Sequence, residues 1–255
     1  MIDIHCHILP GLDDGADNPE ETIQMCRLAL AEGVTAIFAT PHLFQEMFST
    51  DRELILSVFE RTRNLLEEEG IPLKLYPGSD LHLVPDLPER FAQGKGVTLN
   101  HGKYFLLELP SRVLPKNLHG LVFDLISNGY LPIITHPERN LPILRNPSIL
   151  LELLSAGALC QITAMSVTGE FGKESEWFSR ALIEAGGVHF IASDAHSTGW
   201  RNPSLLPALK VAENLVGRET ARRFVVDHPE IVLAGGEIEA AVVEAFPRRK
   251  RFWFF

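Results

Sequence analysis

The sequence has little cysteine, no long apolar run and no excess of positive charge. Its three cysteines, Cys6, Cys26 and Cys160, are odd in number and lie in apolar surroundings, so we expect buried free thiols in a reducing compartment and no disulfide framework. No apolar run is long enough to span a bilayer. The first expected strand begins at Met1 or Ile2, which leaves no room for a signal peptide. We therefore expect a cytoplasmic protein.

The charge balance is acidic. The formal net charge is -10, from 23 Lys and Arg against 33 Asp and Glu. A general nucleic-acid-binding protein should present a basic surface, so this balance argues against that class. Hydrophobic residues make up 45% of the chain and charged residues 22%, which is typical of a globular protein with a sizeable core. An acidic chain also fits a site that gathers carboxylates around cations.

The 255 residues are enough for one large domain or two small ones, but no linker and no strong internal repeat divides them. We predict a single domain over residues 1–246 and a distinct tail over residues 247–255, which is basic and then aromatic. We expect the tail to pack on the domain, with contact to a membrane or a partner as the alternative.

Short apolar runs alternate with amphipathic stretches along the chain. We expect helices to begin near Pro19, Asp51, Asn117, Ser148, Glu174, Ser204 and Glu219. After the N-terminal strand, the runs that predict strands are Val34–Ala39, Pro72–Tyr76, Tyr104–Leu109, Leu131–Thr135, Ala158–Thr163 and Val188–Ala192. About seven such units of ~30 residues predict an α/β fold whose mostly parallel sheet closes, or nearly closes, into a (β/α) barrel.

The N-terminal strand ends in His5-Cys6-His7. Because side chains alternate across a strand, the two imidazoles point to one side and Cys6 to the other. Two imidazoles on one face can hold a metal ion, although a lone His-x-His is just as easily a chance pair. The later strands favour the metal-binding interpretation, because most of them also end in histidine or carboxylate side chains.

Histidine or carboxylate side chains stand at the ends of six of the seven expected strands or in the loops that follow. In a parallel barrel every strand delivers its C-terminal end to the same mouth. Each residue alone could be structural, but the set would repel or stay unpaired without cations. Each metal takes about four to six ligands, counting waters, so the set suits two or three ions. The nine candidate ligands are His5, His7, Asp14, His42, Asp80, Glu108, His136, Asp194 and His196.

The candidate ligands stand in a series of motifs: His5-x-His7, Pro41-His42, Gly78-x-Asp80, a strand ending in Glu108, His136-Pro137-Glu138-Arg139 and Ser193-Asp194-x-His196. In this order, the motifs resemble the PHP (polymerase and histidinol phosphatase) superfamily. The opening, residues 2–16, is similar to its bacterial branch of metal-dependent protein-tyrosine phosphatases from capsule and exopolysaccharide operons, and the resemblance covers essentially the whole chain.

The resemblance implies a distorted (β/α)7 barrel of the PHP type around two or three divalent metal ions, commonly Mn2+, with Fe or Zn as alternatives. The family usually has Glu where Asp80 stands, so either the backbone comes closer here or the metal bridge is weaker. By this analogy the three ligand sets are His5, His7, Asp80 and Asp194; Asp80, Glu108 and His136; and Asp14, His42 and His196.

The expected chemistry is phosphoester hydrolysis. A water that bridges two divalent ions becomes hydroxide-like and can attack phosphorus in line. Arg139 and Arg201 match family positions suited to binding phosphate through a planar guanidinium, although each could be a surface residue. A phenolate leaving group, with a pKa near ~10, needs little acid assistance, so we name no general acid. The other histidines fit no ligand pattern, and we expect His82 to lie nearest the mouth.

The leading hypothesis is a protein-tyrosine phosphatase that acts on the tyrosine-rich tail of a polysaccharide-export kinase. The first alternative is a small-molecule phosphatase of the superfamily, histidinol phosphatase above all. Those enzymes tend to place a His near Asp14, so the Asp13-Asp14-Gly15 loop favours the tyrosine phosphatase. The second alternative is a non-catalytic metal-binding barrel, against which the full ligand set argues.

Overall fold

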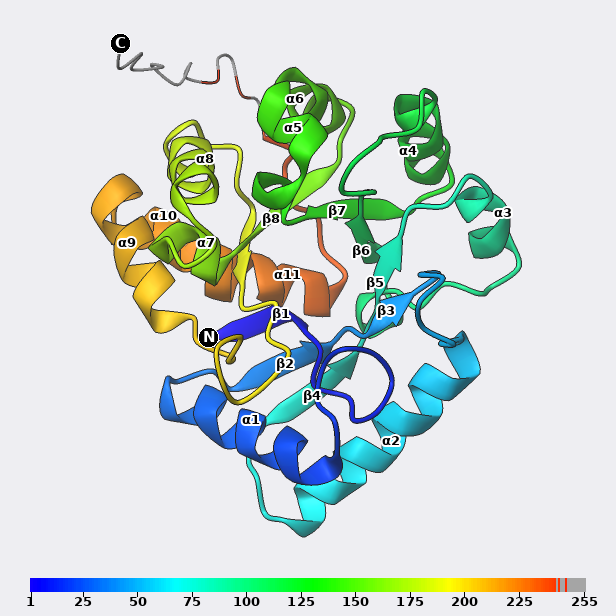
Figure 1. Ribbon diagram of the computed structural model, residues 1–255, viewed down its shortest axis with the longest axis vertical. Coiled ribbons are helices and arrows are strands. Elements are labelled where there is room, and N and C mark those ends of the chain that lie inside the picture. Colours follow the sequence, from blue (N-terminus) through cyan, green and yellow to red (C-terminus); the bar gives the residue numbers. More distant parts are fainter. Residues whose placement is uncertain (242, 244–245, 247–255) are drawn as a thin grey trace.

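Every strand pair in the described part of the chain is parallel, as the alternating pattern predicts. The computed structural model describes residues 1–241, 243 and 246. Figure 1 shows the strands arranged around a centre, with most of the helices outside them. The strands are β1 (Ile2–Cys6), β2 (Ala36–Ala39), β3 (His42–Leu43), β4 (Lys74–Pro77), β5 (Asp80–His82), β6 (Tyr104–Glu108), β7 (Leu131–Thr135), β8 (Leu159–Thr163) and β9 (Phe190–Ala192).

The predicted strands over Val34–Ala39 and Pro72–Tyr76 are each followed by a second short strand, β3 and β5, which the sequence pattern did not predict. Thr40 and Pro41 separate β2 from β3, and Pro41 has no N–H to donate to a ladder. Between β4 and β5, a Cβ on Gly78 would lie 2.7 Å from Leu99 Cδ2, so the backbone passes closely there. One sheet has the order β1-β2-β4 and the other β3-β5-β6-β7-β8-β9. Seven strand positions therefore remain.

The first and last positions meet at the C-terminal ends of their strands. Asp194 N donates to His5 O and His7 N donates to Ala195 O, both over 2.8 Å. No continuous ladder joins β1 to β9 among the described residues. These two bonds nevertheless bring the residues that follow β9 against the end of β1.

The helices follow the predicted order, with added short elements. Asn18 caps α1 through a bond from Glu21 N over 2.9 Å, and Asp51 caps α2 through Leu54 N over 2.8 Å. The α-helices of the described residues are α1 (Pro19–Ala31), α2 (Arg52–Glu68), α3 (Leu87–Ala92), α4 (Leu118–Ser127), α5 (Leu141–Arg145), α6 (Ser148–Ser155), α7 (Ala164–Thr168), α8 (Lys173–Glu184), α9 (Leu206–Val216), α10 (Arg218–Arg222) and α11 (His228–Ala234).

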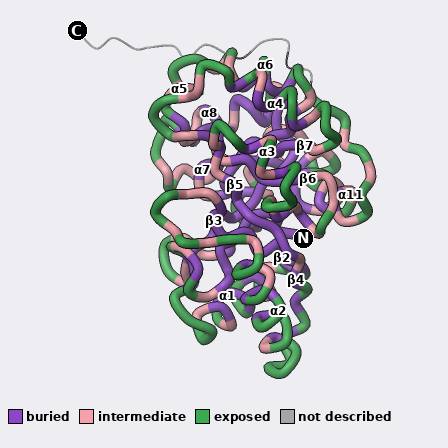
Figure 2. Tube along the Cα trace, turned by 90° about the vertical axis from the view of Figure 1, so that its right-hand side faces the viewer, coloured by how far each residue is buried: buried purple, intermediate pink, exposed green. Residues whose placement is uncertain are grey.

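Two apolar cores hold these layers together. The larger lies between the strands and the outer helices, and the smaller fills the inside of the ring of strands. Figure 2 shows the buried strands enclosed by partly exposed helices. Helix α11, which the sequence pattern did not predict, adds Val232 to the inner core, and Tyr104 Oη donates to Gly236 O over 3.0 Å just beyond it. The inner core therefore fills the end of the ring opposite the mouth.

Cys6, Cys26 and Cys160 are buried free thiols, as predicted. Among the described residues, no helix has both the length and the apolar character needed to cross a membrane. The predicted tail over residues 247–255 lies outside the described residues.

Candidate metal centre

All nine candidate ligands lie together at the C-terminal ends of the strands, which we call the mouth. β1 carries His5 and leads into His7, β3 begins with His42, β5 begins with Asp80, and β6 ends with Glu108. His136 follows β7, Asp194 and His196 follow β9, and Asp14 lies in the loop after β1. Three groups have ligand atoms within 4.8 Å of one another: His7, Asp14, His42 and His196; His5, His7 and Asp80; and His42, Asp80 and Glu108.

The two imidazoles of the N-terminal motif turn their Nε2 atoms toward each other, 3.1 Å apart. His5 Nδ1 donates to Gln161 Oε1 over 2.9 Å, and His7 Nδ1 donates to Asp13 Oδ2 over 2.7 Å. Each ring therefore carries its proton on Nδ1, and two Nε2 lone pairs converge. That arrangement is repulsive by itself and favourable around a shared cation, so the donor set fits a metal ion.

Asp80 is the hub of the cluster. Its Oδ2 lies 3.6 Å from His5 Nε2, 3.7 Å from His42 Nδ1 and 3.8 Å from His136 Nε2. Asp80 Oδ2 and His42 Nδ1 are buried without a hydrogen-bond partner. These separations are close to the roughly 3.0–3.5 Å expected between two ligands at about 2.1 Å from one ion. In the ladder of β3 and β5, Asp80 stands directly opposite His42.

A second set of donors faces solvent around Asp14. Asp14 Oδ1 lies 3.4 Å from His196 Nε2 and 3.5 Å from His42 Nε2. Burial opposes ionisation of Asp14, but the hydrogen bond and charge of His196, with the charges of His7 and His42, outweigh it and lower its pKa to about 2. Gly15 lets this loop approach β1, because a Cβ there would lie 2.1 Å from His7 O.

Asp194 joins the cluster to both candidate arginines. Its Oδ1 lies 3.5 Å from His5 Nε2 and 3.6 Å from His7 Nε2. Its Oδ2 accepts from Arg139 Nη1 and, over 2.7 Å, from Arg201 Nη2. Burial alone would raise the pKa of Asp194, but the charges of His5, Arg139, Arg201 and His136 hold it well below its usual range. The carboxylate is therefore ionised and faces the ligand cluster with one oxygen and the guanidiniums with the other.

Two candidate ligands have a left-handed backbone that is uncommon outside glycine. The φ angle is 34° at His136 and 52° at Asp194. Such conformations cost about 1–3 kcal/mol each and persist where the surrounding structure enforces them. At His136 the backbone turns sharply from β7 into the 3₁₀ turn Pro137–Arg139, which aims Arg139 back at Asp194.

Burial keeps the imidazoles of β1 available as ligands. Desolvation lowers the pKa of His5, and desolvation followed by the charges of His196, His42 and His5 lowers that of His7 well below its usual range. Both rings are thus neutral at neutral pH, and a neutral imidazole is the form that binds metal.

Several residues around the cluster were missed by the sequence analysis. Asp13 and Gln161 orient the two imidazoles of β1, although the strand that contains Gln161 was expected to add nothing to the mouth. Glu108 Oε2 accepts from Gln45 Nε2 over 2.6 Å and lies 3.1 Å from His82 Nδ1. His82 therefore does approach the mouth, as expected. Asp13 stands beside a predicted ligand, but an amide such as Gln161 carries no comparable signal in a single sequence.

The comparisons with known proteins agree over the whole chain. The model of the family described as "Capsular polysaccharide synthesis, CpsB/CapC" matches residues 1–234. Tyrosine-protein phosphatase YwqE of Bacillus subtilis (strain 168) is 38% identical over 255 residues, 100% of both chains. Putative tyrosine-protein phosphatase CapC of Staphylococcus aureus is 39% identical over 254 residues, 100% of this chain and 99% of CapC.

A solved structure extends this similarity to three dimensions. It comes from the crystal structures of YwqE from Bacillus subtilis and CpsB from Streptococcus pneumoniae, described as unique metal-dependent tyrosine phosphatases. The TM-score is 0.93 at 37% sequence identity, over 97% of this chain and 100% of the solved one.

Proposed function

This chain belongs to the capsular polysaccharide synthesis CpsB/CapC family, and from that premise we propose that it is a metal-dependent tyrosine-protein phosphatase. The observation that carries the proposal is the pair of imidazole lone pairs that converge 3.1 Å apart beside two buried carboxylates. The names of two relatives, tyrosine-protein phosphatase YwqE and putative tyrosine-protein phosphatase CapC, support the same activity.

The metal ligands in this proposal are the nine residues of the mouth. His5, His7, Asp80 and Asp194 would hold one ion, Asp80 with Glu108 and His136 would hold a second, and Asp14, His42 and His196 would hold a third. The close approach of His7 to the Asp14 group and of His42 to Glu108 supports bridging between these sets. An all-nitrogen and oxygen donor set without thiolate suits Mn2+, the proposed ion, with Fe and Zn as alternatives.

Bound divalent ions would supply an activated water and neutralise charge on the phosphoryl oxygens. The chain's own contribution is to hold Arg139 and Arg201 beside that position. Both guanidiniums are bonded to Asp194, which fixes them next to the ligand cluster with N–H groups left to bind a phosphoryl group. Asp194 thus couples ligand geometry to phosphate binding.

The proposed substrate is phosphotyrosine in a protein, and specifically in the tail of a tyrosine kinase of polysaccharide export. The family description and the names of the relatives support a role in capsule synthesis. A phenolate leaves more readily than an alkoxide, because its pKa is near ~10. We place the enzyme in the cytoplasm, where three unpaired buried thiols are expected.

The experiment combines metal analysis with a choice of substrates. Gently purified protein should contain two or three divalent ions per chain and should turn over a phosphotyrosine peptide far faster than histidinol phosphate. Chelation should remove the activity and Mn2+ should restore it. A preference for histidinol phosphate would make the chain a small-molecule phosphatase. Bound metal with no turnover of either substrate would indicate the non-catalytic barrel.

A further inference from the structure

Two aromatic side chains stand beside the two arginines at the mouth. Phe171, which follows α7, lies under the Arg139 guanidinium, with Cζ 4.4 Å from the ring centroid. Trp200 directly precedes Arg201 and meets Phe171 in a T-shaped contact, with centroids 5.4 Å apart and planes at 69°. We call Phe171 and Trp200 the aromatic rim.

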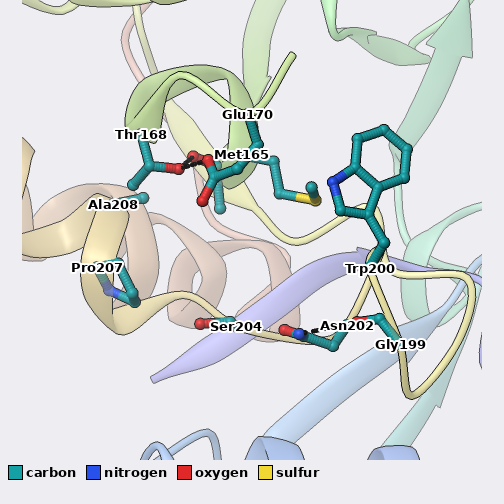
Figure 3. Close-up of a pocket in the computed structure, with 10 residues that line it drawn as sticks. Met165, Thr168, Glu170, Gly199, Trp200, Asn202, Ser204, Pro207 and Ala208 are labelled. Carbon is teal, nitrogen blue, oxygen red and sulfur yellow. Dashed lines mark hydrogen bonds between the residues drawn. The ribbon is translucent and has the colours of Figure 1, made fainter.

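The rim is continuous with the candidate metal centre. Trp200 lines one cavity together with Asp14, His196 and Arg201. It also lines a neighbouring cavity of about 280 Å³ between α7 and the start of α9. Figure 3 shows the Met165 side chain of that second cavity extending toward the Trp200 indole. Trp200 therefore stands between the mouth and a second cavity of mixed polar and apolar lining.

We propose that the aromatic rim binds the phenyl ring of phosphotyrosine and so makes the enzyme select aryl phosphates over alkyl phosphates. This inference rests on the proposed phosphatase function and on phosphate binding by Arg139 and Arg201. In an aryl phosphate one oxygen atom separates the ring from phosphorus, so a phosphate bound to these guanidiniums places its ring beside Phe171 and Trp200. An alkyl phosphate presents only a methylene group there.

A purely structural role explains the rim less well. Phe171 does support Arg139, but the Trp200 side chain is 63% exposed and meets Phe171 through a T-shaped contact. An exposed indole adds little to the core, whereas aromatic rings readily pack edge to face or offset against a third ring. The position of Trp200 beside a phosphate-binding residue is what a substrate contact requires.

The test compares one peptide carrying phosphotyrosine with the same peptide carrying phosphoserine. For each substrate the rate of a variant is divided by that of the wild type, which cancels the difference in leaving-group pKa. Trp200→Ala should lower kcat/KM for phosphotyrosine by about tenfold, mainly through KM, and change that for phosphoserine by less than about twofold. Trp200→Phe should recover most of the loss. Phe123→Ala, with a ring 62% exposed on α4 and outside both cavities, is the matched control.

Equal losses of kcat/KM on both peptides would contradict binding of the phenyl ring by the aromatic rim, but would not contradict the proposed phosphatase function. If the wild type hydrolyses neither peptide, both the proposed function and the proposed role of the aromatic rim are contradicted. If Trp200→Ala does not fold, competitive inhibition of the wild type decides the question. Phenylphosphonate should then bind about tenfold tighter than methylphosphonate, and equal inhibition constants would exclude the rim.

Discussion

Asp13 fixes the tautomer of His7 through a hydrogen bond of 2.7 Å to Nδ1, and the same oxygen accepts from His42 N over 2.8 Å. One carboxylate thereby ties two candidate ligands from different strands into one geometry. Its position matters because a carboxylate on the far nitrogen orients an imidazole and raises its basicity toward a metal.

Asp13→Asn should therefore weaken metal binding without removing a ligand. The amide keeps the shape but loses the charge, so we expect the affinity for Mn2+ to fall by about 10- to 100-fold. Calorimetric titration of metal-free protein with Mn2+ measures this directly. Asp124→Asn, on the exposed side of α4, removes the same charge away from the mouth and should leave the affinity unchanged. Equal affinities for Asp13→Asn and wild type would show that His7 needs no carboxylate partner.

His136→Ala and Asp194→Asn should each nearly abolish phosphatase activity while the barrel stays folded. Both residues lie at the mouth and outside the apolar cores, where barrels place their chemistry. We expect losses of more than about 100-fold, with circular dichroism like that of the wild type. His119→Ala is the control, because His119 pairs with Glu152 on the outer surface over 3.0 Å. Near-normal turnover with full metal content in either variant would contradict the ligand assignment.

The stability of the fold should depend on pH through His189, which is buried and directly precedes β9, at the opposite end of that strand from Asp194. Its Nδ1 accepts from Cys160 N over 3.0 Å, so protonation would set two N–H groups against each other. Burial, and then the charge of His228, lowers the pKa of His189 to about 4. The unfolded chain, with a pKa near ~6.5, binds more protons between these values, so the free energy of unfolding falls as pH drops through this window.

Urea unfolding at pH 7 and pH 5 measures this effect. From His189 alone the wild type should lose about 2 kcal/mol between the two values. His189→Gln keeps an acceptor for Cys160 N but cannot take up the proton. Between pH 7 and pH 5 its free energy of unfolding should therefore fall by about 2 kcal/mol less than that of the wild type. Other titrating groups, the metal ligands included, are common to both proteins and cancel in the difference. The same loss in both proteins would exclude His189 as the cause.

The sequence predicts which candidate ligands gather at the mouth better than it predicts the residues that orient them. The nine candidate ligands stand at strand ends in a recurring pattern, and parallel topology alone brings them together. Gln161 contacts His5 from 156 residues away, and nothing in its neighbours distinguishes it from any other strand amide. The short strands β3 and β5 and the inward position of α11 also depend on tertiary packing, which periodicity cannot show. Register and hydrogen-bond partners therefore came only from the fold.

The loop that carries Trp200 and Arg201 is anchored by Glu32 at the end of α1. Its carboxylate accepts from Ser204 Oγ over 2.7 Å, Leu205 N over 2.9 Å and Leu206 N over 3.2 Å, at the start of α9. Glu32→Gln loses the charge that stabilises this helix N-terminus, at a cost of about 1–2 kcal/mol. Amide hydrogens of residues 197–206 should exchange faster, while Glu184→Gln on α8 should change nothing there. Unchanged exchange rates in Glu32→Gln would show that Glu32 does not stabilise this loop.

The last prediction concerns Arg139 and the phosphate of the substrate. Arg139 donates to Asp194 and stacks on Phe171, so its guanidinium is held in one orientation beside the ligand cluster. A fixed cation stabilises the charge that shifts among the phosphoryl oxygens during transfer. Arg139→Lys keeps the charge but loses the planar fork, so kcat/KM should fall substantially. Arg139→Ala should lose about 2–4 kcal/mol, or roughly 30- to 1000-fold.

Two controls separate phosphate binding from other roles of Arg139. Metal content must be measured in each variant, because the bond to Asp194 could couple the arginine to ligand geometry. Arg90→Ala removes an arginine that makes the same two kinds of contact. Arg90 forms an ion pair with Asp86, and its Cζ lies 4.6 Å from the centroid of the Phe44 ring, but neither partner is a candidate ligand. Arg90→Ala should work like the wild type on one phosphotyrosine peptide. Equal kcat/KM for wild type, Arg139→Lys and Arg139→Ala would remove Arg139 from the site, because a cation that binds the reacting phosphate cannot be lost without effect.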